Sequence, residues 1–302
     1  MPSVTAYRAG SYLSRRMPEV VGRSVARAAG VGASATGDKR TIVARNLERV
    51  LGRELGRAES RRRVAATFEW YARYYVESFR LPELSAREID RGFAYEGFGE
   101  IDRAVAEGRG PILVLPHLGT WEWAAWWLAL EPGMNVTAVV EPLEPPEVFE
   151  WFVSFRESLG MNIVPLGPDA GREVVAAIKR NDVVCLLADR DLVGDGVPVE
   201  FFGEPTTLPA GPAALALRTG APILPTAVYW RGSSRHAWVR PPMEIERQGT
   251  FRADVARITQ ALAHELESLI RAAPEQWHML NPNWPSDYRA LGLPVPDHLQ
   301  EL

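Results

Sequence analysis

The chain has 302 residues, of which 46% are hydrophobic and 24% are charged. This composition is typical of a globular protein and excludes extended disorder. The length allows a full core and lies just above the roughly 250–300 residues at which a single core usually stops growing. No stretch approaches the roughly 18 uninterrupted apolar residues of a membrane-spanning helix. We therefore expect one large domain with an N-terminal helical extension.

Charge is distributed unevenly along the chain. Residues 1–63 contain 14 Lys and Arg against 5 Asp and Glu, a balance of +9, although the whole chain carries −4. Residues 4–28 are predicted to form one helix with apolar residues on one face and arginines on the other. Such a helix either packs on the main domain or lies in the interface of an anionic membrane. Nucleic acid is disfavoured, because few aromatic residues accompany the arginines.

The pattern after the first helix changes along the chain. Residues 30–39 form a small-residue linker, and helices are predicted at 40–51 and 58–79. Short apolar runs then alternate with helical stretches. The predicted strands are 112–115, 136–140, 162–164, 183–188, 199–202, 223–230 and 237–240, and the predicted helices are 120–130, 146–159, 170–179, 210–218 and 253–272.

This alternation predicts an α/β fold with a largely parallel central sheet, flanked by helices on both faces. Residues 1–80 are expected to form a basic, membrane-facing helical region. Residues 81–302 are expected to form the α/β part of the molecule. We expect the two regions to pack together as one continuous structural domain.

The stretch PHLGTWEW contains the strongest candidate for a reactive group. His117 follows the apolar run 112–115, and open α/β sheets bind ligands at the carboxyl ends of their strands. Gly119 permits a tight turn, and Thr120 is a plausible cap for a helix that contains Glu122. We expect Glu122 to contact the His117 ring, which would fix its tautomer and make the other nitrogen a better base. The alternative is an ordinary histidine at a strand end.

Tryptophans crowd the helix that follows His117. One core-facing stripe needs fewer large aromatic residues, so some of them should line a groove for an apolar ligand. Trp121 and Trp123 are the predicted substrate contacts. The four tryptophans are Trp121, Trp123, Trp126 and Trp127.

Charged residues also gather near the ends of later predicted strands. Carboxylates at several strand ends would suit the hydroxyl groups of a sugar, and an arginine among them could pair with one or hold a phosphate. Each of these charges could equally be a solvated or paired surface group. The candidates are Glu141, Arg156, Asp189, Arg190, Asp191 and Glu200.

Several other kinds of site are excluded by their missing signatures. The sequence has no P-loop, no Gly-x-Ser-x-Gly and no His-Glu-x-x-His, and the remaining histidines show no ligand spacing. We therefore expect no metal and no cofactor. Cys185 is the single cysteine and lies in an apolar run, which indicates a buried thiol in a reducing compartment.

The His117-x-x-x-x-Glu122 pattern resembles the His-x4-Asp/Glu motif of glycerolipid and lipid A type acyltransferases. Residues 189–216 (DRDLVGDGVPVEFFGEPTTLPAGPAALA) and 273–284 (APEQWHMLNPNW) extend the resemblance to the lipid A late-acyltransferase superfamily over nearly the full length. RNL at 45–47, DRDL and QWHML most resemble its actinobacterial members that acylate a phosphatidylinositol mannoside. The chain departs from many relatives in having Glu rather than Asp at position 122.

This resemblance implies a mixed sheet with a long acyl groove. It also implies transfer of a fatty acyl group, typically palmitoyl, from acyl-CoA to a mannose 6-hydroxyl at the cytoplasmic face of the plasma membrane. His117 would be the general base and Glu122 its orienting partner. The groups expected on the acceptor side, or as structural groups, are Glu141, Arg156, Asp191 and Glu200.

Two alternatives to this function stay open. The acceptor could be a different molecule, such as lipid A or glycerol phosphate. The protein could also be a non-catalytic lipid-binding protein that has kept the groove.

Overall fold

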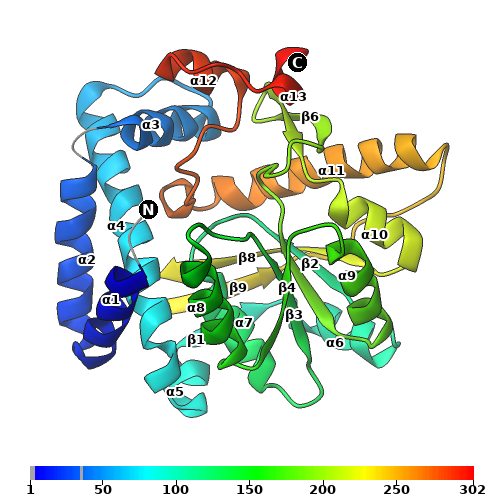
Figure 1. Ribbon diagram of the computed structural model, residues 1–302, viewed down its shortest axis with the longest axis horizontal. Coiled ribbons are helices and arrows are strands. Elements are labelled where there is room, and N and C mark those ends of the chain that lie inside the picture. The colour runs from blue at the N-terminus through cyan, green and yellow to red at the C-terminus, as the bar shows by residue number, and fades with distance from the viewer. Residues whose placement is uncertain (1–3, 35–36) are drawn as a thin grey trace.

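The computed structural model describes residues 4–34 and 37–302, apart from the Glu19 side chain. At its centre is a seven-stranded sheet in the order β1-β9-β8-β2-β5-β3-β4 (Figure 1). These strands are β1 (Phe93–Glu96), β2 (Ile112–Leu115), β3 (Val136–Val140), β4 (Met161–Pro165), β5 (Val183–Leu187), β8 (Ile223–Arg231) and β9 (Ser234–Val239). Two further strands, β6 (Val197–Phe201) and β7 (Glu204–Leu208), form a separate antiparallel pair.

The central sheet is mixed and mostly parallel. Strand β2 pairs in parallel with β5 and β8, and β3 pairs in parallel with β4 and β5. Strand β9 runs antiparallel to β8, and β1 pairs in parallel with β9. The predicted fold class is therefore confirmed.

Strand β2 illustrates why the core has two halves. All four of its residues are buried, as expected for a strand covered on both faces. Ile112 and Val114 belong to one apolar cluster and Leu113 and Leu115 to the other, because successive side chains point to opposite faces. Helices α9 (Ala170–Lys179), α10 (Gly211–Thr219) and α11 (Phe251–Arg271) cover the first face. Helices α5 (Ala86–Arg91), α6 (Phe98–Ala106), α7 (Trp121–Leu130) and α8 (Pro146–Glu157) cover the second.

The N-terminal region contains four helices: α1 (Val4–Arg16), α2 (Glu19–Ala33), α3 (Asp38–Leu51) and α4 (Arg57–Arg80). The prediction of one helix over residues 4–28 was wrong. The chain breaks before Pro18, because proline lacks an N–H and disfavours helical backbone in the residue before it. Helix α2 then continues into the predicted linker, of which residues 35–36 lie outside the described residues. None of the helices among the described residues combines the length and apolarity needed to cross a membrane.

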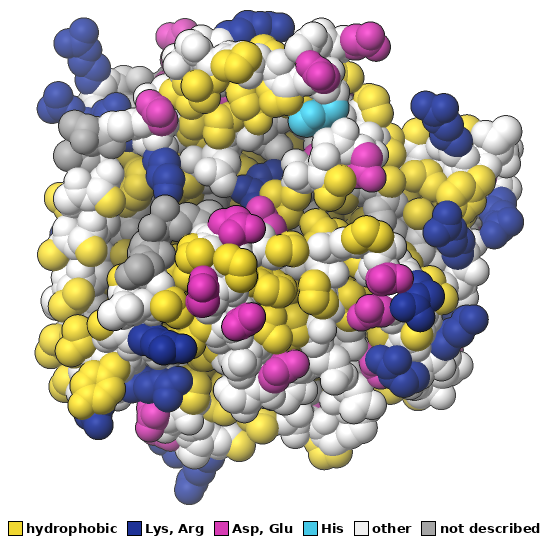
Figure 2. Space-filling view, in the orientation of Figure 1, with side chains coloured by type: hydrophobic (Ala, Val, Ile, Leu, Met, Phe, Trp, Pro, Cys, Tyr) yellow, Lys and Arg dark blue, Asp and Glu magenta, His cyan; other side chains and the backbone are white. Residues whose placement is uncertain are grey.

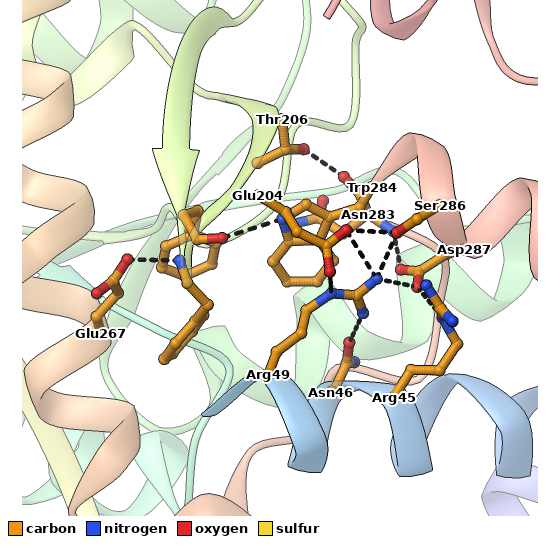
Figure 3. Close-up of polar contacts among 12 residues, drawn as sticks. Arg45, Asn46, Arg49, Glu204, Thr206, Glu267, Asn283, Trp284, Ser286 and Asp287 are labelled. Atoms are coloured by element: carbon orange, nitrogen blue, oxygen red, sulfur yellow. Dashed lines mark hydrogen bonds and ion pairs between the residues drawn. The ribbon is translucent and has the colours of Figure 1, made fainter. Parts of the chain in front are cut away.

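Buried polar contacts join α3 to the C-terminal part of the chain (Figure 3). The Arg49 guanidinium binds Glu204 of β7 at 2.7 Å and Asp287 of α12 (Pro285–Leu291) at 2.6 Å. Arg49 also lies over the Trp284 ring, 4.2 Å from its centroid. The Asn46 amide donates to the Met279 carbonyl at 2.9 Å. These contacts fix the segment 276–287 against the rest of the molecule, while the predicted division at residues 80 and 81 stays a prediction.

The turn between β2 and α7 depends on Gly119. Its φ is +67°, in the left-handed region, and its N–H donates to the Gln276 carbonyl at 2.9 Å. A Cβ at this position would lie 1.7 Å from the Val228 carbonyl oxygen. Only glycine therefore lets the turn pass this close to β8.

Replacing Gly119 by Ala should destabilise the protein by more than about 3 kcal/mol, because backbone strain adds to a clash with a backbone carbonyl. Gly232→Ala is the matched control, since Gly232 has φ +65° but open space around its Cβ position. The control should cost only about 1 kcal/mol. Urea unfolding measures both values, and equal losses in the two variants would contradict this account of the turn.

Candidate active site

His117 and Asp189 form the central pair of the site. His117 Nδ1 lies 2.6 Å from Asp189 Oδ1, and the His117 backbone N–H donates to Asp189 Oδ2 at 2.9 Å. Sheet register explains the pairing: Leu115 of β2 lies opposite Leu187 of β5, so two residues further on His117 lies opposite Asp189. The predicted position of His117 at the carboxyl end of a sheet strand is confirmed.

Asp189 is fully buried, and three donors hold it as a carboxylate. Burial alone would raise the pKa of Asp189, but the His117 charge and hydrogen bonds outweigh it, so this pKa falls below its usual value. One of those bonds comes from the Trp277 indole N–H, which lies 2.7 Å from Asp189 Oδ2. A carboxylate at Nδ1 favours the tautomer with its proton on Nδ1, which leaves Nε2 as a proton acceptor. The His117 side chain is 25% exposed, so the ring remains accessible.

The prediction that Glu122 contacts the His117 ring was wrong. Glu122 is buried, and its Oε1 accepts from Arg156 at 2.6 Å and from the Tyr74 hydroxyl at 3.1 Å. Burial would lower the pKa of Arg156, but the Glu122 carboxylate outweighs it and raises that pKa. Burial, followed by the charge of Glu122, raises the pKa of Tyr74. Glu122 therefore anchors α7 to α8 and α4, and the ring partner comes from β5.

The tryptophans of α7 divide between the core and a cavity. Trp121 is half-buried, and its ring centroid lies 5.8 Å from that of His117. Trp123 is buried, donates to the Ile89 carbonyl at 3.2 Å and lies under the Arg235 guanidinium. The predicted substrate contact at Trp123 is therefore wrong, because the core occupies both its ring and its N–H.

An apolar cavity runs between α7 and the sheet. Its volume is about 100 Å³. Its walls come from α7, from α6 and from strands on both sides of β2. The lining extends from Tyr95 of β1 to Met161 of β4, the strands at the two ends of the sheet. Trp121, whose ring lies next to that of His117, and Glu122 also line the cavity. Cys185 also lines the cavity, and burial raises the pKa of its thiol to about 12.

The other predicted charged residues lie in three different places. Glu141 and Arg190 follow the adjacent strands β3 and β5, and Arg190 donates to Glu141 at 2.7 Å. Asp191 instead accepts from loop N–H groups, including those of Gly194 and Gly196, each at 2.9 Å. Both Asp191 oxygens are therefore engaged in shaping the loop. Glu200 lies on β6 of the separate two-stranded sheet, so its predicted place at a strand end of the site was wrong.

Sequence reasoning missed the contribution of the closing segment. Trp277 holds Asp189, and the Asn283 amide donates to the Asp189 carbonyl at 3.3 Å. His278 donates its backbone N–H to the His117 carbonyl at 2.7 Å. The motifs RNL, DRDL and QWHML meet here, because Asn46 binds Met279 and Asp189 binds Trp277. The three motifs were visible in the sequence, but their spacing along the chain does not show that they meet in space.

His278 is a buried histidine in an aromatic environment. Neither of its ring nitrogens has a hydrogen-bond partner within the part of the chain that the structure describes, and the rings of Tyr71, Tyr74 and Trp121 lie 5.4–5.7 Å away. Burial, assisted by the charge of His117, lowers the pKa of His278 to about 3. His278 therefore stays neutral beside the central pair. No group of three or more His, Cys, Asp or Glu in the described part of the chain could hold a metal ion.

Comparison with known proteins places this site in a family. The bacterial lipid A biosynthesis acyltransferase family matches residues 3–286. A phosphatidylinositol mannoside acyltransferase of Mycobacterium tuberculosis is 40% identical over 289 residues, which cover 93% of this chain and 88% of that protein. The phosphatidylinositol mannoside acyltransferase of Mycolicibacterium smegmatis is 38% identical over 93% of this chain and 91% of its own length.

A lipid A biosynthesis acyltransferase of Haemophilus influenzae is more distant, at 24% identity over 64% of this chain and 59% of its own length. The site combines a histidine at a strand end of an α/β sheet with an apolar cavity that the neighbouring Trp121 lines. The chain belongs to the bacterial lipid A biosynthesis acyltransferase family.

The neutral state of His278 predicts a pH dependence of stability. The unfolded chain binds a proton at this histidine near its ordinary pKa of 6.5, whereas the folded protein binds it only near 3. Stability should therefore fall as the pH drops through this window, by up to about 1.4 kcal/mol per pH unit. Urea unfolding of the wild type and of His278→Phe between these pH values tests this. In His278→Phe the free energy of unfolding should fall less steeply as the pH drops. The same pH dependence in the variant and the wild type would contradict a neutral, buried His278.

Proposed function

We propose that the protein transfers a palmitoyl group from acyl-CoA to the mannose 6-hydroxyl of a phosphatidylinositol mannoside. The observation that carries this proposal is the accessible His117 ring, which is held by the buried Asp189 and packs against Trp121, a residue that lines the apolar cavity. The names of the mycobacterial relatives, at 38–40% identity over 93% of the chain, support the choice of acceptor. The reaction needs no resident cofactor, since the thioester is already activated.

His117 is the proposed general base. Asp189 holds Nδ1, so Nε2 takes the proton from the mannose hydroxyl. The hydroxyl oxygen attacks the thioester carbonyl carbon and forms a tetrahedral intermediate. Its collapse breaks the carbon–sulfur bond, and the leaving thiolate takes the proton back from the imidazolium. The ester and free CoA are the products, and no acyl-enzyme is formed. The buried carboxylate stabilises the imidazolium while the proton resides there.

The apolar cavity is the proposed acyl site. Its lining contains few polar side chains, of which Glu122 and Arg156 neutralise each other. An acyl chain in this cavity removes apolar surface from water without leaving polar groups unpaired. Trp121 lines the cavity and its ring lies roughly perpendicular to the His117 ring, with the centroids 5.8 Å apart, so the thioester end of a bound chain would lie near the base.

The pair formed by Glu141 and Arg190 is the proposed acceptor-side contact. Both follow strands at the same sheet edge as His117, and the Glu141 side chain is 42% exposed. A carboxylate accepts from sugar hydroxyls, and a guanidinium binds the phosphate of a phosphoinositide. The Arg190 side chain is 17% exposed, so part of the pair can be reached from solvent.

The first two helices are the proposed membrane contact. They expose large apolar side chains next to arginines such as Arg16 and Arg27. Figure 2 shows hydrophobic side chains along the left edge of the molecule, where α1 and α2 lie. Apolar insertion and attraction to anionic lipids would together hold the protein at the cytoplasmic face of the plasma membrane, without spanning it. The exposed apolar residues are Tyr12, Leu13, Val20, Val21, Val25 and Val31.

The alternatives are less well supported. The lipid A relative covers less of the chain at lower identity than the mycobacterial relatives do. A non-catalytic lipid-binding protein would have no use for a buried carboxylate that holds a solvent-accessible imidazole. Incubation with palmitoyl-CoA and a panel of glycolipids, followed by mass spectrometry, identifies the acceptor. A product on lipid A alone would overturn the proposed acceptor but leave the chemistry intact.

His117→Ala should abolish turnover, and Asp189→Asn should lower kcat by about 10²–10⁴, because the amide no longer holds the required tautomer. Asp169→Asn removes a carboxylate of a largely exposed ion pair and serves as the matched control. Turnover is measured as release of free CoA thiol with a phosphatidylinositol mannoside acceptor. Wild-type kcat in Asp189→Asn, with the control unchanged, would contradict the proposed mechanism.

A further inference from the structure

A second pocket lies where α3 and α4 begin. We call it the arginine pocket, and it is lined by Arg40, Leu55, Arg57, Ser60 and Arg61. Arg40 belongs to the start of α3, and Arg57, Ser60 and Arg61 belong to the start of α4. Figure 2 shows cationic side chains at the upper left, over the region where these helices begin in Figure 1. Among the described residues, three of the five that line the pocket carry a permanent positive charge and none is a carboxylate.

The three guanidinium groups of the pocket form no ion pair among the described residues. Within the described part of the chain, no carboxylate oxygen lies within 4.0 Å of Arg40, Arg57 or Arg61. The nearby Glu59 is already bound by Arg53 and Arg63. Other arginines of the same region pair with carboxylates, namely Arg45, Arg49, Arg53 and Arg63. The arginine pocket is therefore a local excess of positive charge that a bound anion would neutralise.

The chemistry of the lining favours phosphate over other anions. Each guanidinium donates through a planar fork that matches two oxygens of an oxyanion. The groups come from two different helices, so they approach a common ligand from different directions. Phosphate presents oxygens in several directions and carries up to two negative charges, whereas a carboxylate has two oxygens in one plane. The Ser60 hydroxyl offers a further donor.

We propose that the arginine pocket binds a phosphate group. Both a phospholipid headgroup and a soluble phosphate offer this chemistry. The position next to α2 favours the lipid, because α2 leads into α3 and exposes Val25 and Val31. Apolar side chains on α2 would enter the interface while the pocket holds a headgroup phosphate. This binding does not depend on the proposed acyl transfer.

The test compares the full-length wild type with the triple variant Arg40→Gln, Arg57→Gln, Arg61→Gln. Sedimentation measures binding to phosphatidylcholine vesicles that contain phosphatidic acid. Vesicles that contain oleate at matched surface potential separate phosphate recognition from charge alone. Calorimetric titration with inorganic phosphate and with adenosine 3′,5′-bisphosphate forms the soluble arm. The triple variant should bind phosphatidic acid vesicles at least about tenfold more weakly, because each lost charge-assisted hydrogen bond weakens binding about tenfold.

The control variant removes equal charge elsewhere, through Arg87→Gln, Arg252→Gln and Arg289→Gln at exposed positions. It should stay within about twofold of the wild type. If the triple variant loses binding only to phosphatidic acid vesicles, the bound phosphate belongs to a lipid headgroup. If the wild type binds the soluble phosphates and the triple variant does not, the pocket binds a soluble phosphate. Equal losses in the triple and control variants, or equal losses on oleate and phosphatidic acid vesicles, would overturn the proposal. So would wild-type binding of every phosphate probe by the triple variant.

Arg40 is half-buried, so its replacement could disturb folding. The double variant Arg57→Gln, Arg61→Gln removes only exposed side chains and keeps the proposal testable. Its binding to phosphatidic acid vesicles should still be weaker by at least about tenfold. Wild-type binding in a folded double variant would overturn the proposal. Turnover of a soluble short-chain acceptor should be unchanged in this variant, which separates the pocket from the acyl-transfer chemistry.

Discussion

The structure of the site depends on one buried carboxylate. Asp189 is fully buried, and its side chain accepts from the His117 backbone, the His117 ring and the Trp277 indole. A charge in such a place is costly unless donors surround it, and here they come from two separate segments. The parallel register of β2 and β5 brings His117 and Asp189 opposite each other, and the closing segment supplies Trp277. The carboxylate therefore links the sheet, the base and the C-terminal part of the chain.

Polar contacts away from Asp189 hold the surrounding segments in place. Arg49 and Asn46 of α3 hold the segment that carries Trp277 and His278, through Asp287 and the Met279 carbonyl. Glu122 and Arg156 form a buried ion pair that joins α7 to α8 beside the cavity. Buried ion pairs contribute little net stability, but removing one partner leaves an unpaired charge and is strongly destabilising. We infer that these pairs fix the positions of helices, whereas the His117–Asp189 pair supplies the chemistry.

The sequence predicted much of the fold because its signals were local. Strands β2 and β3 and helix α9 have the predicted bounds, since each is a continuous apolar run or a clear helical period. Strand β1 escaped prediction because it is a short edge strand whose residues are mostly exposed. The break at Pro18 was missed because the apolar period continues across it.

The site was predicted less completely, because its partners are set by strand order. Both His117 and Asp189 were recognised as residues at strand ends. The local spacing nevertheless favoured Glu122 as the ring partner, since a first-turn helical carboxylate lies nearby in sequence. Asp189 is the ring partner because β2 and β5 are neighbours in the sheet. The hydrophobic periodicity of a sequence does not show which strands are neighbours. Glu200 was misplaced because it lies on a separate hairpin. Asp191 follows β5 as predicted and accepts from N–H groups of the loop, which is the structural one of its two expected roles.

The central claim is that Asp189 holds His117 with its proton on Nδ1 and leaves Nε2 free as the base. Nuclear magnetic resonance of ¹⁵N-labelled histidine side chains measures this directly, at a pH where the His117 ring is neutral. His117→Ala assigns the signal among the five histidines of the chain. The account predicts an Nδ1–H tautomer in the wild type that is lost in Asp189→Asn. An Nε2–H tautomer in the wild type, or a tautomer unaffected by Asp189→Asn, would contradict it.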